Sequence, residues 1–438
     1  MSGMKIKKQW PRMVRILAAA SFIVAFCIAF FSGIGGLFQV QFGPALMRSL
    51  STFSLGALSA VLVIALATIL FGRFYCAVFC PLGILQDLAG FLSGRKAKPV
   101  PNFLRTRYTI AALVYGLLIA GWNAGFLLLD PYSNFGRMLG AFSAGALALP
   151  ILVILLSLWK KRLYCTVVCP VGTLLGLLAK CGVFRLAIRE NCVKCGKCAG
   201  SCPSGCIDIA AGKLDNERCV RCMNCISVCP LGCIGFASPG EIPFDASRRA
   251  FLVQTGILAA GAAVGFMLGK AGAAHWRRRL AVFPPGAGDP DRFTALCTSC
   301  QLCTVNCPSK IIVPAPGGAG PVSLDLTRGA CRFDCTRCSE VCPAGALLPL
   351  SLAEKRKTKI GQAEVDPGSC LVLLADDPCG ACADACPLQA IELDEETGLP
   401  RVDAARCIGC GVCRSVCRSK EKAIYIKGIE KQVRLNGV

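Results

Sequence analysis

The cysteines of this chain recur in groups of four, and their spacing limits what the backbone around them can do. Two groups have the pattern C-x2-C-x2-C-x3-C-P, in "CVKCGKCAGSCP" and "CVRCMNCISVCP". This spacing lets a short loop supply three ligands to one 4Fe-4S cluster, while the fourth cysteine ligates a neighbouring cluster. Zinc sites usually separate two C-x2-C pairs by a longer stretch. We therefore predict one cluster on Cys192, Cys195, Cys198 and Cys229 and another on Cys219, Cys222, Cys225 and Cys202.

The second half of the chain contains four further groups of four cysteines. The first and last keep the compact start, the middle two are widened, and Arg418 replaces the final proline. These groups are Cys297, Cys300, Cys303 and Cys307; Cys331, Cys335, Cys338 and Cys342; Cys370, Cys379, Cys382 and Cys386; and Cys407, Cys410, Cys413 and Cys417. By analogy with four-cluster electron-transfer subunits, we expect the first group to share ligands with the fourth, and the second with the third. The total is six 4Fe-4S clusters. Cys206 and Cys233 are interpreted as small packing residues.

Apolar residues gather into segments in this chain, whose mean hydropathy is +0.57. Four segments approach the ~20 residues that a helix needs to cross a membrane. They are Val14–Phe38, Thr52–Phe71, Thr109–Leu129 and Leu139–Trp159. A fifth, Ser247–Ala274, is rich in glycine and alanine. The pattern predicts an α-helical transmembrane bundle of four spans plus a fifth.

The basic residues predict how such spans would be oriented. They gather before the first segment and after the second and fourth, whereas the opposite loops contain only Arg48 and Arg137. The positive-inside rule then places the N-terminus on the cytoplasmic side of a bacterial inner membrane. The residues "SRRAF" at Ser247 resemble a twin-arginine export signal and predict a periplasmic C-terminal region. An ordinary signal-anchor helix is the alternative, and the basic run Arg277–Arg279 after the helix opposes export.

A second cysteine motif occurs twice, in "YCAVFCPLG" and "YCTVVCPVG". Each copy follows an apolar segment, so the segments and motifs form a parallel repeat that can bring the two pairs together. Four thiols at one place could bind a further metal centre, form redox-active disulfides or pack as small residues. We favour a redox or metal role. The residues are Cys76, Cys80, Cys165 and Cys169.

Composition excludes several other functions. His275 is the single histidine, so bis-histidine haem is excluded, and no C-x-x-C-H motif for covalent haem occurs. No G-x-G-x-x-G motif opens a dinucleotide-binding unit. Twenty-four thiolates and six 2+ cluster cores would lower the formal charge of +22 to +10. Because the remaining positive residues lie largely beside apolar segments, they indicate membrane topology and not nucleic-acid binding.

These motifs support a resemblance to known families. Residues 1–240, with the apolar segments, the twin C-x3-C-P motifs and the two-cluster tail, resemble the NapH-type membrane ferredoxins of periplasmic nitrate reduction. Residues 241–438 resemble the exported four-cluster ferredoxins of the NapG and MauM type. The resemblance implies a natural fusion that carries electrons from the quinol pool toward a periplasmic reductase or cytochrome c. It leaves the terminal acceptor undefined.

We expect four domains from this organisation. They are a transmembrane domain at 1–183, a cytoplasmic two-cluster ferredoxin of α+β type at 184–240, a signal or anchor helix at 241–276 and a periplasmic four-cluster ferredoxin at 277–438. Clusters without a catalytic constellation predict an electron-transfer protein, with quinol dehydrogenation as its only enzymatic step. Quinol oxidation also needs an acid–base group. Asp87 and Asp130, beside the apolar segments, are the candidates, although either could merely cap a helix or form an ion pair.

Two other functions are open. Similar C-x3-C-P membrane ferredoxins act as metal-reducing maturation factors, and soft thiolates suit Cu(I). In that case the thiols would handle copper, and the second ferredoxin region would be superfluous. A purely structural anchor for a reductase is the third alternative, which six clusters argue against.

Overall fold

The computed structural model describes residues 2–52, 55–94, 103–140, 144–237, 248–276, 281–315, 320–375 and 377–435. The chain forms two compact units. The first comprises Met1–Ala29, Leu37–Met138 and Phe142–Ala274, and the second comprises Phe30–Gly36, Leu139–Ala141 and His275–Val438. The predicted division into four domains stays a prediction. Ser247 of the twin-arginine motif and the basic run Arg277–Arg279 lie outside the described residues.

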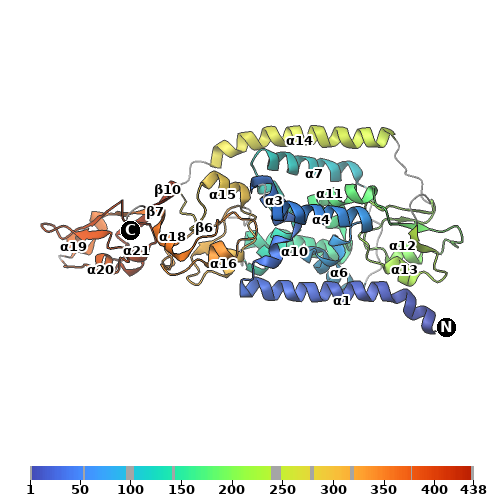
Figure 1. The fold of residues 1–438 in the computed structure, drawn as a ribbon, viewed down its shortest axis with the longest axis horizontal. Helices are drawn as coiled ribbons and strands as arrows, with labels where there is room; N and C mark the ends of the chain where they lie inside the picture. The colour runs from blue at the N-terminus through green and yellow to red at the C-terminus, as the bar shows by residue number, and fades with distance from the viewer. Residues whose placement is uncertain are drawn as a thin grey trace. The chain divides into compact units, whose positions relative to one another are not determined.

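The first unit is mainly helical, and several of its helices run side by side (Figure 1). Its helices before the first ferredoxin region are α1 (Ser2–Ser32), α2 (Gly36–Gln39), α3 (Phe42–Thr52), α4 (Leu55–Phe71), α5 (Tyr75–Val78), α6 (Pro81–Leu92), α7 (Leu104–Ile119), α8 (Ala124–Leu129), α9 (Pro131–Gly140), α10 (Ala144–Trp159), the π-helix η1 (Tyr164–Val168) and α11 (Pro170–Lys180). Helix α14 (Arg248–Trp276) follows the ferredoxin region.

The predicted bundle of four spans plus a fifth is wrong. Among the described residues, one helix is long and apolar enough to cross a membrane, Gln9–Ser32 within α1, with a mean hydropathy of 2.4. A signal sequence near the N-terminus would pass the same test of length and composition. The other apolar helices have 10–17 residues, Leu55–Phe71 being one of them. A helix of 17 residues is roughly 25 Å long, less than the ~30 Å hydrocarbon core.

The third predicted segment shows why the apolar pattern was misleading. Its residues form two helices, α7 and α8, because the chain turns sharply at Gly121, where φ is +87°. The N–H of Trp122 donates to the oxygen of Leu117 at 2.9 Å, which closes the end of α7. Continuous hydrophobicity therefore concealed a turn that only the glycine marked.

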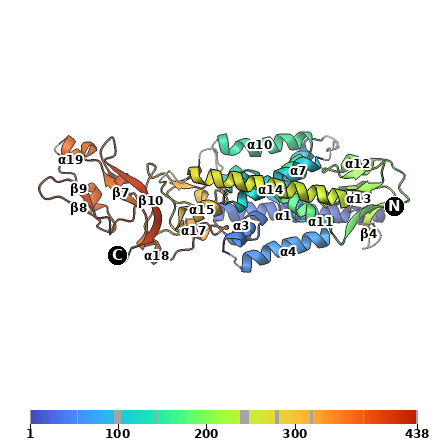
Figure 2. The same ribbon diagram turned by 90° about the horizontal axis from the view of Figure 1, so that it is seen from above.

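Helix α14 packs along α7 (Figures 1 and 2). Glycines make this close approach feasible: a Cβ at Gly116 would lie 2.3 Å from the oxygen of Ala262, and one at Gly265 would lie 2.4 Å from the oxygen of Leu113. The contact also brings the Lys180 side chain within 3.3 Å of Gln254 Oε1. Packing on α7 therefore joins α14 to the first unit.

The first ferredoxin region, of predicted α+β type, belongs to the same unit. Strand β1 (Arg185–Ile188) pairs antiparallel with β4 (Ile234–Ala237), and β2 (Ile207–Asp208) pairs with β3 (Lys213–Leu214). Helices α12 (Lys197–Ser201) and α13 (Asn224–Val228) complete it. The amides of Val183 and Phe184 donate to the end of α4, which ties this region to the helices.

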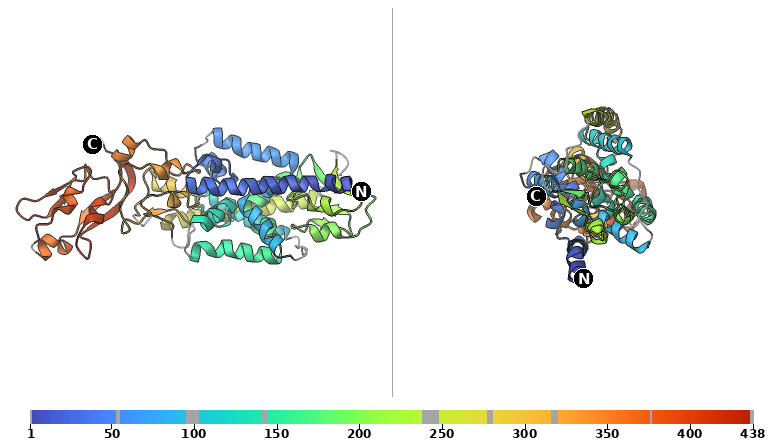
Figure 3. Two further views of the ribbon diagram at one scale, coloured as in Figure 1. Left: turned by 90° about the horizontal axis from the view of Figure 1, so that it is seen from below. Right: turned by 90° about the vertical axis from the view of Figure 1, so that its right-hand side faces the viewer.

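The second unit contains a second ferredoxin region built from short elements. Its longest pairing is the antiparallel sheet of β7 (Thr358–Val365) and β10 (Ile424–Arg434), seen in orange and red in Figure 3. The helices are α15 (Pro290–Leu296), α16 (Leu302–Val305), α17 (Arg337–Glu340), α18 (Leu352–Lys357), η2 (Pro367–Ser369), α19 (Leu371–Leu374), α20 (Ala381–Asp384) and α21 (Val412–Val416). The remaining strands are β5 (Ile312–Val313) with β6 (Ser323–Leu324) and β8 (Ile391–Leu393) with β9 (Pro400–Val402).

Candidate iron-sulfur and thiol sites

Two cavities in the first ferredoxin region are each lined by three cysteines from one compact motif and one from the other. Their empty space, part of which is open to solvent, is about 340 and 310 Å³. The structure therefore brings together both sets of thiols that the spacing predicted, with the fourth cysteine exchanged. The first lining includes Cys192, Cys195, Cys198 and Cys229, and the second includes Cys202, Cys219, Cys222 and Cys225.

Three similar cavities, of about 350 to 360 Å³, lie in the second unit. They correct the predicted pairing, because the first group exchanges its fourth cysteine with the second group, and the third exchanges with the fourth. Neighbouring groups can pair directly, so the long crossover expected by analogy is not needed. The three linings contain Cys297, Cys300, Cys303 and Cys342; Cys370, Cys379, Cys382 and Cys417; and Cys386, Cys407, Cys410 and Cys413.

The fourth set in this unit consists of Cys307 with the first three cysteines of the second group. Cys331 and Cys338 both interact electrostatically with Cys307. The amide of Cys331 donates to the oxygen of Cys410 at 2.9 Å, so this set adjoins the set that contains Cys410. Lys355, which is 3% exposed, interacts with both of these thiols. The Cys331 set therefore lies beside the set that contains Cys410, and the four sets of this unit form one series.

All four compact motifs share an unusual backbone around their second cysteine. The residues on both sides have positive φ, such as +62° at Met223 and +63° at Gln301. Left-handed backbone costs a residue with a side chain roughly 1–2 kcal/mol, so the loop accepts strain to turn its thiols toward one cavity. In the widened groups the corresponding Thr336 and Gly380 have φ of −119° and −109°. The left-handed pairs are Lys194 and Gly196, Arg221 and Met223, Ser299 and Gln301, and Gly409 and Gly411.

Backbone amides supply hydrogen bonds to several of these sulfurs. In three groups, the cysteine before the proline accepts an N–H bond at 3.3 to 3.4 Å from a residue four or five positions later. Such bonds stabilise a thiolate and help set a cluster's potential. The donors are Cys233 to Cys229, Leu347 to Cys342 and Ala390 to Cys386.

The geometry suits polynuclear clusters. Across the part of the chain that the structure describes, no three histidine, cysteine, aspartate or glutamate side chains gather closely enough to hold a single metal ion. The thiols instead surround cavities. Cys206, predicted to be a small packing residue, has its Sγ 3.4 Å from that of Cys202 and lines the same cavity. Its position adds a weak S–H donor beside a ligand sulfur.

The twin C-x3-C-P motifs form a separate buried site in the first unit. Their four thiols, each at most 5% exposed, belong to one core that also contains Cys222 of the first ferredoxin region. In both copies the amide of the second cysteine donates to the oxygen of the tyrosine five positions earlier, at 3.0 Å. The second cysteine is then extended, and proline begins the next helix, α6 or α11. The repeat is therefore conserved in backbone structure as well as in sequence.

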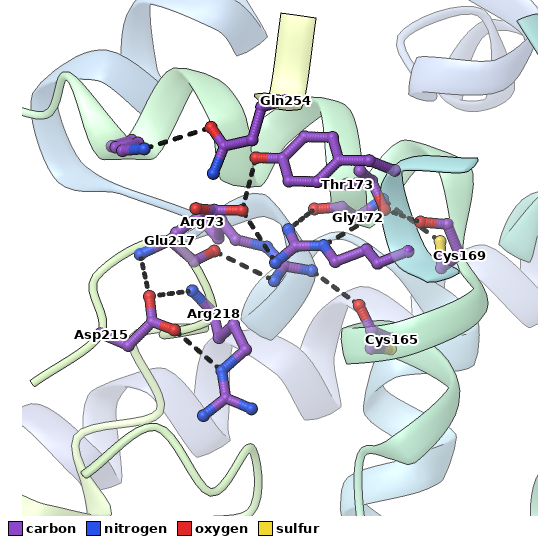
Figure 4. Close-up of polar contacts among 12 residues, drawn as sticks. Arg73, Cys165, Cys169, Gly172, Thr173, Asp215, Glu217, Arg218 and Gln254 are labelled. Atoms are coloured by element: carbon purple, nitrogen blue, oxygen red, sulfur yellow. Dashed lines mark hydrogen bonds and ion pairs between the residues drawn. The ribbon is translucent and has the colours of Figure 1, made fainter. Parts of the chain in front are cut away.

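Each copy of the repeat has an arginine that reaches into the other copy. The Arg73 side chain donates to the oxygen of Cys165 at 3.0 Å, and the Arg162 side chain donates to the oxygen of Cys76 at 3.0 Å. Both residues are 0% exposed. Figure 4 shows Arg73 between Cys165 and Glu217, whose backbone oxygen it also meets at 3.4 Å. The two arginines thus join the repeats and the ferredoxin region.

Glycine is required where these arginines pass. A Cβ at Gly172 would lie 2.6 Å from Arg73 Nη2, and a Cβ at the equivalent Gly83 would lie 2.5 Å from the oxygen of Cys76. Gln86 completes the surroundings, because its Nε2 lies 3.1 Å from Cys165 Sγ. The thiols are consequently enclosed by donors on several sides.

Asp87 is a counter-ion in this structure. It contacts Arg162 Nε at 2.7 Å and Arg15 Nη1 at 2.6 Å. Burial opposes its ionisation, but the two guanidinium groups outweigh burial and lower its pKa. A carboxylate held in this way is a poor proton acceptor near neutral pH, so Asp130 is the stronger of the two acid–base candidates.

Asp130 has a different environment. It is 1% exposed, and its Oδ2 accepts bonds from the amide and hydroxyl of Ser133, both at 2.8 Å, as in a helix N-cap. Its Oδ1 is buried and has no hydrogen-bond partner among the described residues. Burial raises the pKa of Asp130 to about 6. Helix capping therefore accounts for Oδ2 of Asp130, whereas Oδ1 can still accept a proton or a hydrogen bond.

Three tyrosines link Asp130 with the four thiols. Tyr75, Tyr115 and Tyr164 each interact electrostatically with Asp130 and with at least one of the four cysteines. The Tyr164 hydroxyl donates to the oxygen of Leu129 at 2.5 Å, directly beside Asp130. Asp130 and the thiols are therefore parts of one buried neighbourhood.

Comparison with known proteins supports the cluster assignments by region. Models of 4Fe-4S binding domains match residues 53–99 and 142–189, which include the twin motifs, and residues 189–205 and 213–235. Models of 4Fe-4S dicluster domains match residues 296–357 and 377–420, which agrees with the pairing of neighbouring groups. Fold and sites together define a multi-cluster iron-sulfur electron-transfer protein.

The chain belongs to the ferredoxin-type 4Fe-4S protein family that includes the methylamine utilization protein MauM. It is 34% identical to MauM of Methylophilus methylotrophus over 157 residues, 33% of this chain and 69% of that protein. Ferredoxin-type protein NapF of Escherichia coli is 28% identical over 33% of the chain and 84% of its own length. NapH of Escherichia coli is 31% identical over 36% of the chain and only 58% of its own length. No solved structure matches significantly.

Sequence reasoning missed the residues that surround the twin motifs. Arg73 and Arg162 were interpreted only as topology signals, and Gln86 was not considered. Their equivalent positions, two residues before Tyr75 and Tyr164, were a usable signal, because a basic residue repeated within a repeat is rarely incidental. The reciprocal contacts between copies require the three-dimensional structure.

Proposed function

We propose that this chain takes electrons from a membrane quinol and passes them through six 4Fe-4S clusters to a second redox protein. The observation that carries the quinol assignment is Asp130, a buried carboxylate with a free Oδ1 and a pKa raised to about 6. Quinol oxidation needs such a base, because electron removal acidifies the hydroxyl groups. The resemblance to NapH-type proteins supports the same assignment.

The chemistry balances as follows. One quinol gives one quinone, two electrons and two protons. The first proton goes to Asp130 Oδ1 and the second to water, and the two electrons would be taken up one at a time by clusters held on the cysteine sets. A 4Fe-4S cluster accepts single electrons, so at least two clusters must act for each quinol.

The electron path is proposed from the order of the thiol sets. Cys222 shares a core with the twin motifs, so the Cys222 cluster would be the first ferredoxin cluster in the path, followed by the Cys192 cluster. In the second unit, the order runs from the Cys297 set through the Cys331 and Cys407 sets to the Cys370 set. Each set either exchanges a ligand with the next or touches it.

Lipid is the proposed partner of the apolar helix surfaces. Helices α4 and α10, on opposite sides of the first unit (Figures 2 and 3), expose large side chains, such as Leu55 at 83% and Leu155 at 57%. Apolar surface of this kind usually contacts membrane or protein. Together with α1 as an anchor, it would hold the unit where quinol is dissolved.

The test is anaerobic single-turnover reduction of the purified protein by a quinol analogue, followed by EPR. Asp130→Asn should slow cluster reduction at least tenfold and remove the rise of the rate through about pH 6 that ionisation of Asp130 predicts. Asp208→Asn, which changes an exposed aspartate that also accepts a backbone N–H bond, is the matched control. An unchanged rate and pH profile in Asp130→Asn would contradict the proposal.

The acceptor is proposed to be a periplasmic cytochrome c or reductase. The sequence motif of Ser247, Arg248 and Arg249, where α14 begins, supports this location. An alkaline phosphatase fused after Val438 should be active in cells if the second unit is exported. An inactive phosphatase, with an active cytoplasmic reporter at the same point, would rule out a periplasmic acceptor.

Copper reduction is the alternative function, and the four adjacent soft thiols favour it. Their burial does not decide between the two functions, because each thiol is at most 5% exposed and Asp130 is 1% exposed, so either reactant would have to enter the core. The same purified protein separates the two functions. Rapid Cu(II) reduction by dithionite-reduced protein, without any cluster reduction by quinols, would favour the maturation role.

A further inference from the structure

The twin motifs leave an unexplained charge in the core of the first unit. Arg73 is fully buried, yet none of the described carboxylates forms an ion pair with it, and its Nε has no hydrogen-bond partner. A buried charge without a counter-ion is strongly destabilising. The nearest groups that can become negative are thiols: Cys76 Sγ lies 3.9 Å from Arg73 Nη2.

The neighbouring charges increase the imbalance. Asp87 is shared between Arg15 and Arg162, which leaves one uncompensated positive charge in that triad. Arg107 is balanced by Glu217 at 3.0 Å. With Arg73, the residues around the four thiols therefore have an excess of two positive charges.

Four thiolates around a metal centre of charge 2+ would have a net charge of −2, equal and opposite to this excess. Four neutral thiols, or two disulfides, would add no negative charge at this site and would leave the balance to the neighbouring cluster, whose Cys219 and Cys222 interact electrostatically with Arg73 and Arg162. A centre of several metal ions bridged by sulfide has the charge that matches this excess.

We propose that Cys76, Cys80, Cys165 and Cys169 bind a further iron-sulfur cluster, with Arg73 and Arg162 as its buried counter-ions. Three observations support this assignment independently: the buried Arg73 with its Nη2 3.9 Å from Cys76 Sγ, the amide of Gly172 at 3.3 Å from Cys169 Sγ, and Gln86 Nε2 at 3.1 Å from Cys165 Sγ. Each of these donors would stabilise a thiolate bound to iron, and Arg162, which donates to the oxygen of Cys76, adds positive charge beside them. The inference does not depend on quinol being the electron donor.

The position of this centre gives it a role. It would lie between Asp130, through the three tyrosines, and the cluster that includes Cys222, because Cys222 belongs to the same core as the four thiols. Arg162 interacts with both Cys165 and Cys222 and so adjoins both centres. An electron entering near Asp130 would reach this centre before any ferredoxin cluster.

Iron and sulfide analysis of the anaerobically purified full chain tests the proposal. The six ferredoxin clusters account for 24 iron and 24 sulfide ions per chain, from 24 of the 32 cysteines. A further cluster should add two or four of each. Cys76→Ser and Cys165→Ser should remove that increment and one EPR or Mössbauer component while the ferredoxin signals persist. Cys181→Ser, at an exposed cysteine outside every group, should remove nothing.

Several outcomes would overturn the assignment. These are 24 iron ions in the unaltered chain, stoichiometric zinc or copper at the site, or a disulfide between these cysteines found by mass spectrometry. If the serine variants do not fold, the iron count of the unaltered chain still decides the matter. Arg73→Lys provides a further variant: it should retain the iron and shift the EPR component of this centre alone.

Discussion

The ferredoxin loops and the twin-motif site place thiols in contrasting surroundings. In the loops, backbone amides approach the sulfurs, as Ala390 does for Cys386, and left-handed residues such as Met223 bend the chain around the cavity. At the twin motifs, a helix N-terminal amide, Gly172, also reaches a sulfur, but the side chains of Arg73 and Gln86 supply further donors. A loop can turn several of its own amides inward, whereas a helix offers only those of its first turn, so the helical site adds positive charge from side chains.

The largest effect should come from Arg73→Met, which tests whether that side-chain charge is needed. We expect loss of the iron held by the twin motifs, because thiolates without a counter-ion are costly to bury. In protein stripped of its metal, Arg73→Met should instead stabilise the fold, because it removes an unpaired buried charge. We expect the free energy of unfolding to rise by on the order of 1–4 kcal/mol. Iron analysis and urea unfolding provide the two measurements.

Arg105→Met is the matched control, because Arg105 is exposed in α7, two residues before the buried Arg107. It should change neither iron content nor stability appreciably. If Arg73→Met retains the iron, the thiols of the twin motifs need no side-chain counter-ion. The ferredoxin loops and the twin-motif site would then not differ in this respect.

The second prediction concerns Lys355, a buried lysine near the loop clusters. Lys355 interacts with Cys331 and Cys410 in different sets. Lys355→Met should lower the potentials of both clusters by roughly 50 to 100 mV, because a nearby positive charge favours the reduced form. Redox titration followed by EPR measures the shift. Lys359→Met, which removes a lysine whose Nζ contacts Gln362 and Ala404, is the control and should move neither potential comparably.

A smaller shift is expected at Cys206. If its S–H donates to the Cys202 sulfur, Cys206→Ala should lower the potential of that cluster by about 40 mV, the equivalent of one net hydrogen bond. Cys206→Ser retains a donor and should behave like the unaltered chain. A potential that moves in the serine variant as much as in the alanine variant would indicate a packing role, as predicted from sequence.

The smallest effect tests loop strain. Met223 has a φ of +62°, so Met223→Gly should raise the free energy of unfolding by about 1 kcal/mol. Ala199→Gly, in helix α12, should lower it by roughly 0.5–1 kcal/mol. Denaturant titration of the cluster-loaded protein compares the two. Destabilisation by both changes would mean that the Met223 side chain contributes more through packing than its backbone costs.

The three cysteines that each compact motif supplies to one set could be predicted, because spacing along the chain largely determines which thiols meet. Cys192, Cys195 and Cys198 are separated by too few residues to do otherwise. The partner of each fourth cysteine was predictable in the first unit and not in the second, where analogy gave the wrong pairing. Pairing of Cys342 with the first group depends on how neighbouring loops pack, which spacing alone does not encode.

The helical part was less predictable. Hydropathy alone treats Thr109–Leu129 as one segment, yet Gly121 divides it. The proximity of the twin motifs was inferred correctly from the repeat, since both copies occupy the same place in it. The reciprocal contacts of Arg73 and Arg162 could not be inferred, because they connect residues 92 and 86 positions apart, and only packing decides which copy each arginine contacts.

The order of thiol sets in the second unit also bears on biosynthesis. The cysteine motif at Cys407 is the fourth of its unit in the sequence but belongs to the middle of the proposed path, and strand β10 after it pairs with β7. Gln432 in that strand bonds back to Gly286, near the start of the unit. A chain interrupted before Cys407 would have a gap between its clusters and an unpaired strand edge. Conduction through this unit therefore depends on the segment farthest along the sequence, and the open β7 edge of a chain interrupted there would be prone to pair with other strands.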